Sequence, residues 1–141
     1  MADQIDQYGA ETLDAISVAS RFNRWMYKTI KPFSKNDIIE IGSGIGNISQ
    51  FFVTDGSNIR LSDINEAYLS FLRDKYGKQA NVLEILNIDI SHSDFTVRYT
   101  SLLEKSDTVF SLNVLEHVED EKLALENYLS LIKPGGNIII L

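Results

Sequence analysis

The sequence predicts an α/β fold in which a parallel sheet is covered by helices on both faces. Three observations support this prediction. Short apolar segments of strand length alternate with longer amphipathic segments along the whole chain, which is the pattern of βαβ units. The segment 38–47 runs from an apolar strand directly into a glycine-rich loop. The first four predicted strands are each followed by a loop with polar residues, as expected where parallel strands end at one edge.

The first third of the chain is predicted to hold a long helix, a strand and a short helix. Residues 11–30 form the long helix, because apolar side chains recur at steps of three and four residues, and Pro32 ends it. Residues 37–41 form the first strand, since this short apolar run opens into glycines. Residues 47–53 form the short helix, which stops before Gly56, a residue suited to the left-handed position after a helix.

The middle third is predicted to continue with a strand, a helix and a second strand. Residues 59–61 form a short strand that leads into Asp63. Asn65 is a suitable N-cap for a helix over residues 66–76. Residues 82–86 form the third strand.

The last third repeats the alternation. A short helix is expected around residues 99–105, after a polar and irregular stretch. Residues 109–112 form the fourth strand, and residues 121–132 form an amphipathic helix. Residues 133–136 have the sequence Lys-Pro-Gly-Gly, which predicts a turn before a final apolar strand over residues 137–141.

Composition restricts the class of protein. The 141 residues suffice for one domain with a buried core. The formal net charge of −7 and the pI near 4.7 disfavour nucleic acid as a partner. The absence of cysteine excludes disulfides, thiolate catalysis and cysteine-ligated zinc, and we expect no metal site. No apolar run approaches the roughly 20 residues that span a bilayer, and the N-terminal residues lack the apolar centre of a signal peptide. We therefore expect a cytoplasmic chain without a membrane partner.

The polar loops that follow the strands are predicted to converge. Right-handed crossovers place the carboxyl ends of parallel strands along one edge of the sheet. The glycine loop follows the first strand, Asp63 the second, Asp89 the third, and residues 113–117 the fourth. Ligands of open α/β sheets bind at this edge, so we expect a nucleotide-cofactor site there.

The glycine loop leaves two kinds of cofactor open. A dinucleotide-binding loop has the pattern G-x-G-x-x-G, whereas the glycines here are Gly42, Gly44 and Gly46. Glu40 precedes them, and an acid at this place suits a cationic ligand better than a pyrophosphate. Asp63 lies 21 residues beyond Gly42, a spacing that suits the ribose-binding acid of either kind. An NAD(P)-dependent oxidoreductase is therefore an alternative function.

Five motifs, taken in order, resemble the signature of class I S-adenosylmethionine-dependent methyltransferases. They are IIEIGSGIGN at residues 38–47, Asp63, Asp89-Ile90, SLNVLEHVED at residues 111–120 and LIKPGG at residues 131–136. The resemblance implies a three-layer Rossmann-like sheet of strand order 3-2-1-4-5. It also implies a cofactor-binding core over residues 34–141, preceded by an N-terminal helical extension over residues 1–33 that closes over the cofactor. The core of the family has seven strands, so the last two are missing from this chain.

The resemblance assigns a role to each candidate residue. Asp63 would accept hydrogen bonds from both ribose hydroxyls, and Asp89 would receive the adenine amino group while the Ile90 amide faces the ring. His117 would be the general base if the methyl acceptor is a hydroxyl. The other cofactor-binding candidates are Glu40, Gly42, Ser43 and Gly44 at the amino-acid moiety, Ile64, and Asn113 and Leu115 along the sulfonium end.

The expected function is transfer of a methyl group from S-adenosylmethionine to a small-molecule acceptor by in-line displacement. The loop after the fourth strand lacks the Asn-Pro-Pro-Tyr arrangement of enzymes that methylate nucleic-acid bases, which favours a small acceptor. A non-catalytic S-adenosylmethionine-binding module is a further alternative. Because two strands are missing, we expect a fragment or a domain completed by another chain. We also expect self-association through the exposed edge of the fifth strand, weak cofactor binding, and little or no transferase activity.

Overall fold

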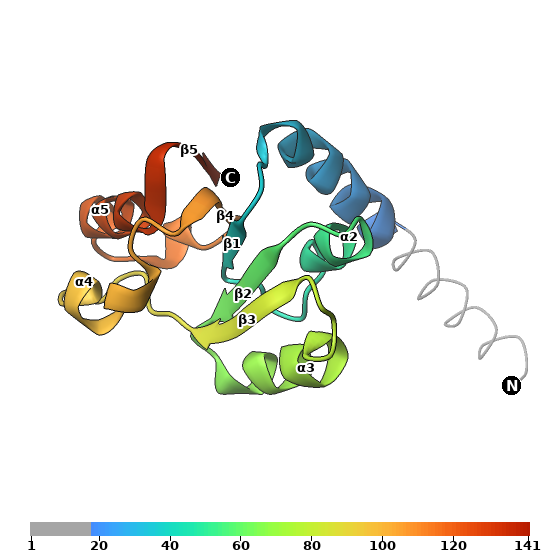
Figure 1. The fold of residues 1–141 in the computed structure, drawn as a ribbon, viewed down its shortest axis with the longest axis horizontal. Helices are drawn as coiled ribbons and strands as arrows, with labels where there is room; N and C mark the ends of the chain where they lie inside the picture. Colours follow the sequence, from blue (N-terminus) through green and yellow to red (C-terminus); the bar gives the residue numbers. More distant parts are fainter. Residues whose placement is uncertain (1–17) are drawn as a thin grey trace, which may run out of the picture.

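A five-stranded parallel sheet with helices on both faces forms the centre of the computed structural model, which describes residues 18–141 (Figure 1). The strand order is β3-β2-β1-β4-β5, and every neighbouring pair is parallel. The predicted fold class and strand order are therefore confirmed. The strands are β1 (Ile38–Ile41), β2 (Ile59–Asp63), β3 (Val82–Asn87), β4 (Ser106–Ser111) and β5 (Ile132–Ile140).

The helices lie between these strands along the chain. Residues 18–30 are helical, and they are the described part of the helix predicted over residues 11–30; the rest of that prediction lies outside the described residues. No helix within residues 18–141 is long and apolar enough to cross a membrane. The labelled helices are α2 (Ser49–Thr54), α3 (Glu66–Tyr76), α4 (Phe95–Arg98) and α5 (Glu121–Leu131), with 3₁₀ turns at Lys31–Phe33, Thr100–Leu102 and Leu115–His117.

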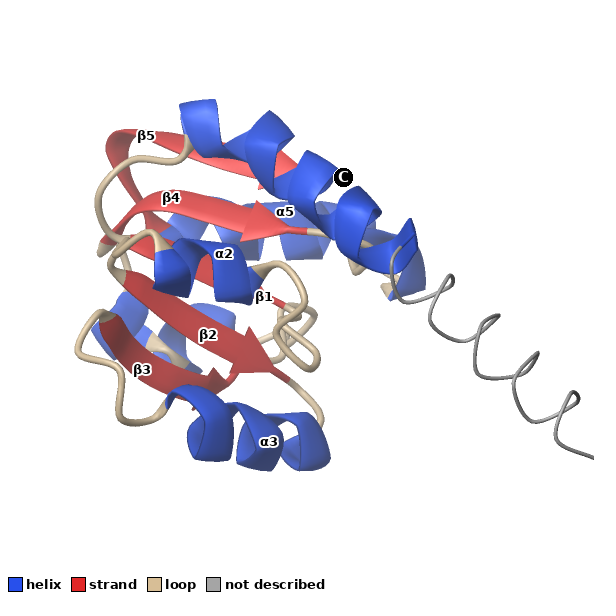
Figure 2. Cartoon of the chain, turned by 90° about the vertical axis from the view of Figure 1, so that its right-hand side faces the viewer, coloured by secondary structure: helices blue, strands red, loops and turns tan. Residues whose placement is uncertain are grey.

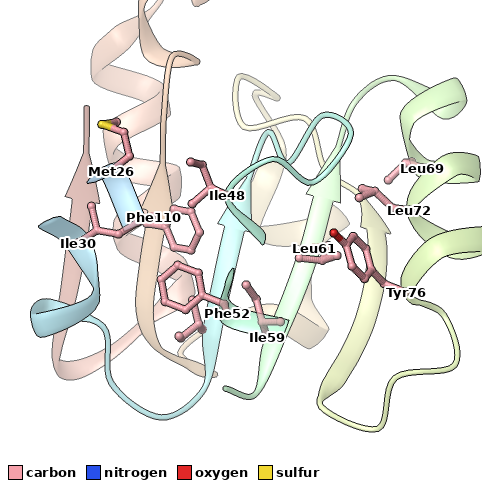
Figure 3. Close-up of a cluster of buried hydrophobic side chains, with 11 residues drawn as sticks. Met26, Ile30, Ile48, Phe52, Ile59, Leu61, Leu69, Leu72, Tyr76 and Phe110 are labelled. Carbon is pink, nitrogen blue, oxygen red and sulfur yellow. The ribbon is translucent and has the colours of Figure 1, made fainter. Parts of the chain in front are cut away.

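Two hydrophobic cores hold these layers together. All four residues of β1 are buried, and alternate side chains point to opposite faces, so that Ile38 enters one core and Ile39 the other. The first core joins the sheet to the helix over residues 18–30, α2 and α3, with Phe52 stacked on Phe110 (Figure 3). The second joins the sheet to α4 and α5 on the opposite face (Figure 2). The sheet is thereby covered on both faces, which leaves the carboxyl ends of its strands open to ligands.

Several predicted boundaries were wrong; the second strand, for example, extends to Asp63 and does not end at residue 61. The helix expected at residues 99–105 is replaced by α4 and the following 3₁₀ turn, because buried Phe95 packs its ring 4.6 Å from that of Tyr99 and starts the turn earlier. β4 begins at Ser106 rather than at residue 109. The first residues of β4 have polar side chains that make hydrogen bonds; for example, the Thr108 hydroxyl accepts a 2.8 Å hydrogen bond from the Lys35 amide. The helix after the glycine loop begins at Ser49 rather than at residue 47.

The turn predicted at residues 133–136 lies inside β5. Ser106 pairs with Ile132 while Thr108 pairs with Asn137, so the intervening residues of β5 bulge from the ladder. Gly135 has φ of +80°, which the bulge requires and which glycine adopts without strain. β5 pairs only with β4 among the described strands, and an edge strand tolerates a proline.

Candidate functional site

Loops from the carboxyl ends of four strands enclose a cleft of about 600 Å³, a volume within the range of small-molecule sites. The cleft brings together the glycine loop after β1, the loop after β2, the loop after β3 and the loop after β4, as predicted. Its lining residues are Ile41, Gly42, Gly44, Asp63, Ile64, Tyr68, Ile88, Asp89, Ile90, Ser91, Asn113, Val114, His117 and Val118.

The glycines of the loop have different physical roles. Gly42 has φ of +78°, and a Cβ there would lie 2.3 Å from Cγ2 of Val114, so a side chain at this position would force Val114 in the loop after β4 to shift. Gly44 also has a left-handed φ, of +54°, but a Cβ there would meet nothing within 4 Å. A Cβ at Gly46 would lie 2.7 Å from the ring of Tyr76 on α3. Gly44 therefore leaves open space on the cleft, whereas Gly42 and Gly46 permit close packing.

Asp63 is held in place by the backbone around it. Its Oδ2 accepts a 2.8 Å hydrogen bond from the Gly44 amide, and its Oδ1 accepts a 2.9 Å hydrogen bond from the Asn65 amide. The residue is only 8% exposed, yet it lines the cleft. Each carboxylate oxygen has about two lone pairs, so both retain capacity for a further donor. A fixed carboxylate with two free acceptor positions fits the adjacent hydroxyls of a ribose.

Asp89 is fixed on the other side of the same cleft. Its Oδ1 accepts hydrogen bonds from the amide and hydroxyl of Ser91, at 2.9 and 2.6 Å. Its own amide donates to the Tyr99 hydroxyl at 2.9 Å. The next carbonyl, of Ile90, accepts a 2.7 Å hydrogen bond from the buried side-chain amide of Asn127 on α5. This loop is thus positioned by groups on the far face of the sheet, and Asp89 itself stays half-buried at the cleft.

Apolar side chains line the cleft together with the two carboxylates. Branched aliphatic residues come from the loops after β2, β3 and β4, and they would contact the faces of a flat heterocycle. The combination of an apolar slot with two acids fits an adenosine, whose ring is flat and whose hydroxyls and amino group are donors. These apolar residues are Ile64, Ile88, Ile90, Val114 and Val118.

A second cleft, of about 210 Å³, lies between the helix over residues 18–30 and the glycine loop. Glu40 and Ser43 line this cleft and are absent from the lining of the first one. The two clefts share Gly42, Gly44 and Asn113, so they are adjacent. The sequence-predicted site residues are therefore divided between two neighbouring spaces.

Glu40 is a buried acid at the base of the second cleft. Burial raises the pKa of Glu40 to about 7, although hydrogen bonds with Ser49 and Ser43 lower it, and the nearby negative charge of Asp63 adds a smaller upward shift. The Ser49 hydroxyl donates directly to the Glu40 carboxylate. The acid can therefore hold or release a proton near neutral pH, and its charge depends on what lies next to it.

The loop after β4 places its three candidates differently. Asn113 adopts a left-handed φ of +55° and lines both clefts. His117 is exposed and lines the first cleft. Leu115 packs against the second hydrophobic core and does not line either of these two clefts. Val114 takes the place at the cleft that the sequence analysis gave to Leu115.

Several residues of the site were missed from the sequence. Val114 and Val118 belong to the loop motif after β4, so their apolar character was an available signal. Phe22, Asn23 and Met26 line the second cleft, but their periodicity indicates only a packed helix. Tyr99 and Asn127 support the loop after β3 from outside the cleft, and the sequence has no feature that reveals such long-range contacts.

Comparison with known proteins decides the family. Residues 39–138 match the family model described as "Methyltransferase domain", which is more than half of the chain. The chain belongs to the methyltransferase domain family. The match includes the strands and loops that build the first cleft, from β1 to most of β5.

Curated relatives and solved structures resemble this methyltransferase domain. The ubiquinone biosynthesis O-methyltransferase of Stutzerimonas stutzeri is 31% identical over 102 residues, which are 72% of this chain and 41% of that protein. The protein of the same name from Coxiella burnetii is 26% identical over 101 residues, again 72% of this chain and 41% of the relative. The chain thus spans about two fifths of the length of these relatives.

Two crystal structures illustrate the shared fold. The trans-methyltransferase CalH in complex with SAH has a TM-score of 0.65 and 20% identity, and the match covers 84% of this chain and 35% of CalH. Coclaurine N-methyltransferase bound to N-methylheliamine and SAH has a TM-score of 0.68 and 14% identity, with 84% of this chain and 35% of that chain covered. At these identities the likeness shows the fold of the methyltransferase domain.

Proposed function

We propose that this methyltransferase domain binds S-adenosylmethionine and takes part in transferring its methyl group to a small-molecule acceptor. The observation that carries the proposal is the cleft of about 600 Å³, where Asp63 and Asp89 line an apolar slot beside the open space at Gly44. Membership of the methyltransferase domain family supports the same cofactor. A dinucleotide-binding site would give no role to the loop after β4 or to the second cleft beside the glycine loop.

The proposed cofactor contacts follow the two clefts. Asp63 holds the ribose hydroxyls, Asp89 receives the adenine amino group, and Ile64 and Ile90 contact the adenine ring. Glu40, whose charge suits an ammonium group, faces the amino-acid end of the cofactor in the second cleft. The remaining contacts to this end and to the sulfonium come from Gly42, Ser43, Gly44, Asn113 and Leu115; Leu115 acts through the backbone of its loop, since its side chain packs in the core.

The chemistry needs alignment more than a reactive side chain. S-adenosylmethionine supplies the activated methyl group when bound, and the residues of this chain orient the two reactants and exclude water. His117 is the proposed proton acceptor for a hydroxyl substrate, because it lines the cleft and is exposed to an incoming molecule. Buried Glu40 is not assigned this role, since it faces the second cleft.

The acceptor is proposed to be a small molecule. The negative charge of the chain opposes nucleic acid, and the curated relatives cited above act in ubiquinone biosynthesis by name. We further propose that the chain works in the cytoplasm. The helix over residues 18–30, as part of an extension over residues 1–33, is proposed to close the second cleft as a lid on the core over residues 34–141.

The unpaired side of β5 supports a proposal about assembly. β5 contributes Ile138, Ile139 and Ile140, which are half-buried, and β4 is its single neighbour among the described strands. Such an edge can add a strand from another chain or from the rest of a longer protein. The chain alone is therefore proposed to self-associate and to show little or no transferase activity.

Isothermal titration separates the proposed function from the nearest alternative. S-adenosylhomocysteine should bind the isolated chain, whereas NADH should not bind under the same conditions. Preferential binding of NADH would contradict the proposal and favour an oxidoreductase. Methyl transfer by a longer polypeptide that includes this chain then distinguishes an enzyme from a non-catalytic binding module.

A further inference from the structure

The exposed side of the helix over residues 18–30 has an unusual surface. Val18, Phe22 and Trp25 are 49%, 53% and 58% exposed, and the rings of Phe22 and Trp25 lie 5.8 Å apart. These residues follow one another at steps of four and three, so they form one stripe along the helix. Soluble helices usually turn such side chains toward the core.

A neighbouring side of the same helix makes its contacts with the domain, since Met26 follows Phe22 by one turn. Met26 and Ile30 are buried in the first hydrophobic core (Figure 3). Tyr27 stacks on Phe51 of α2 at 5.3 Å and meets the edge of Phe52 at 5.0 Å. The helix is therefore docked through these residues, while Val18, Phe22 and Trp25 stay exposed.

A basic stripe runs beside the aromatic one. Arg21, Arg24 and Lys28 are all exposed and follow at steps of three and four residues. Arg24 also lies 5.4 Å from the ring centroid of Phe51, which holds it at the edge of this surface. Residues 18–36 contain five basic residues and no acid, whereas residues 1–17 contain four acids and no basic residue, and residues 37–141 contain eight basic and 16 acidic residues. Positive charge among residues 18–141 is thus concentrated on this helix and on the short segment after it.

We infer that this surface, made of the aromatic and basic stripes, docks on an anionic lipid bilayer with the helix lying in the interface. Lys and Arg beside exposed Trp and Phe on one helix are the features of interfacial helices. Basic residues are attracted by anionic headgroups, and indole and phenyl rings settle at the headgroup level. Residues 37–141, which carry twice as many acids as bases, are repelled by the same surface, and this favours the orientation with the helix toward the bilayer. This inference departs from the sequence-based expectation of no membrane partner, which considered spanning segments.

Docking in this orientation brings the site close to the bilayer. Phe22 belongs to the aromatic stripe and also lines the second cleft. A lipophilic methyl acceptor could then enter from the membrane next to the glycine loop. This consequence rests on the proposed function, but the docking itself does not, so membrane binding and methyl transfer can fail separately.

Trp25 provides the test, because it is the single tryptophan of the chain. Vesicles of phosphatidylcholine with phosphatidylglycerol should shift the Trp25 emission to the blue, brominated lipids should quench it, and added salt should reverse both effects. Pure phosphatidylcholine vesicles should do neither. The double variant Arg21→Gln/Lys28→Gln should weaken partitioning by about 30-fold, which corresponds to about 1 kcal/mol for each cation.

The matched control changes the same charge elsewhere. Lys78→Gln/Lys122→Gln removes two exposed cations from other elements and should leave partitioning within about threefold of the unmodified chain. Equal losses in both double variants, or no partitioning into anionic vesicles, would overturn the inference. A blue-shifted Trp25 in a vesicle-free dimer would assign the surface to a second copy instead. A shift with single-stranded RNA and none with vesicles would also overturn it.

Discussion

Asp63→Asn is expected to weaken cofactor binding without unfolding the chain. The side chain keeps its size and one oxygen but loses its charge and its second acceptor, so one of the two proposed ribose hydrogen bonds is lost. A hydrogen bond to a charged group contributes about 1.5–3 kcal/mol, which corresponds to a rise of roughly 10- to 150-fold in the Kd for S-adenosylhomocysteine. Isothermal titration measures the change.

The structure also specifies the controls for this variant. Asp63 accepts hydrogen bonds from the Gly44 and Asn65 amides, so urea unfolding must show that the variant remains folded at the titration temperature. Asp94→Asn removes the same charge from an exposed residue without a side-chain cap bond, and it should leave the Kd unchanged. A folded Asp63→Asn chain with an unchanged Kd would refute the assignment of the ribose site.

Three further outcomes follow from the same geometry. Burial raises the pKa of Glu40 from 4.5 to about 7, so the folded chain keeps a proton in this window that the unfolded chain releases, and stability falls as the pH rises through it. Glu40→Gln removes this dependence and should be more stable than the unmodified chain above about pH 7, by up to about 3 kcal/mol; parallel stability–pH curves from urea unfolding would contradict this. Gly42→Ala should lower the free energy of unfolding by at least about 1 kcal/mol more than Gly44→Ala does. Both variants carry left-handed strain, but only the new Cβ at position 42 would lie 2.3 Å from Cγ2 of Val114. Similar losses would argue against the distinct roles of the two glycines. Tyr99→Phe leaves the Asp89 amide without its acceptor and should displace the loop after β3. The Kd for S-adenosylhomocysteine should then rise roughly five- to tenfold. A Kd equal to that of the unmodified chain would show that this loop keeps its position without the Tyr99 hydroxyl.

The sheet and the position of the cleft at the carboxyl ends of its strands were predictable, because both depend on local sequence patterns. Apolar runs such as residues 38–41 specify strands that are buried on both faces, and the connections between parallel strands bring all their carboxyl ends together. The convergence of Asp63 and Asp89 at one cleft follows from this topology alone. The alternation of strands and helices in the sequence was therefore enough to predict most of the architecture.

The details of the site depend on contacts between distant residues. Glu40 and Ser43 face a separate cleft because the helix over residues 18–30 packs above the glycine loop, which no local pattern reveals. Val114 and Leu115 both pack against the second core, but only Val114 also lines the first cleft, although both are apolar residues of one motif. The early start of β4 was hidden by Ser106 and Thr108, whose polar side chains are buried.

Lys31, Asp55 and Tyr27 connect the N-terminal helix to the body of the domain. Lys31 lies 2.6 Å from the Asp55 carboxylate, and the Tyr27 hydroxyl donates to the same group. Burial raises the pKa of Asp55, but hydrogen bonds from Lys31, Ser57 and Tyr27 outweigh it and hold the pKa at about 2. The Asp55 carboxylate therefore stays charged at any pH well above 2, and it keeps the contacts that hold the helix over residues 18–30 to the domain.

A structure of the chain with S-adenosylhomocysteine tests the central claim most directly. The account predicts one nucleoside in the cleft, with both ribose hydroxyls within hydrogen-bond distance of the Asp63 carboxylate and the adenine amino group at Asp89. A nucleoside bound elsewhere, or one that contacts neither aspartate, would contradict it.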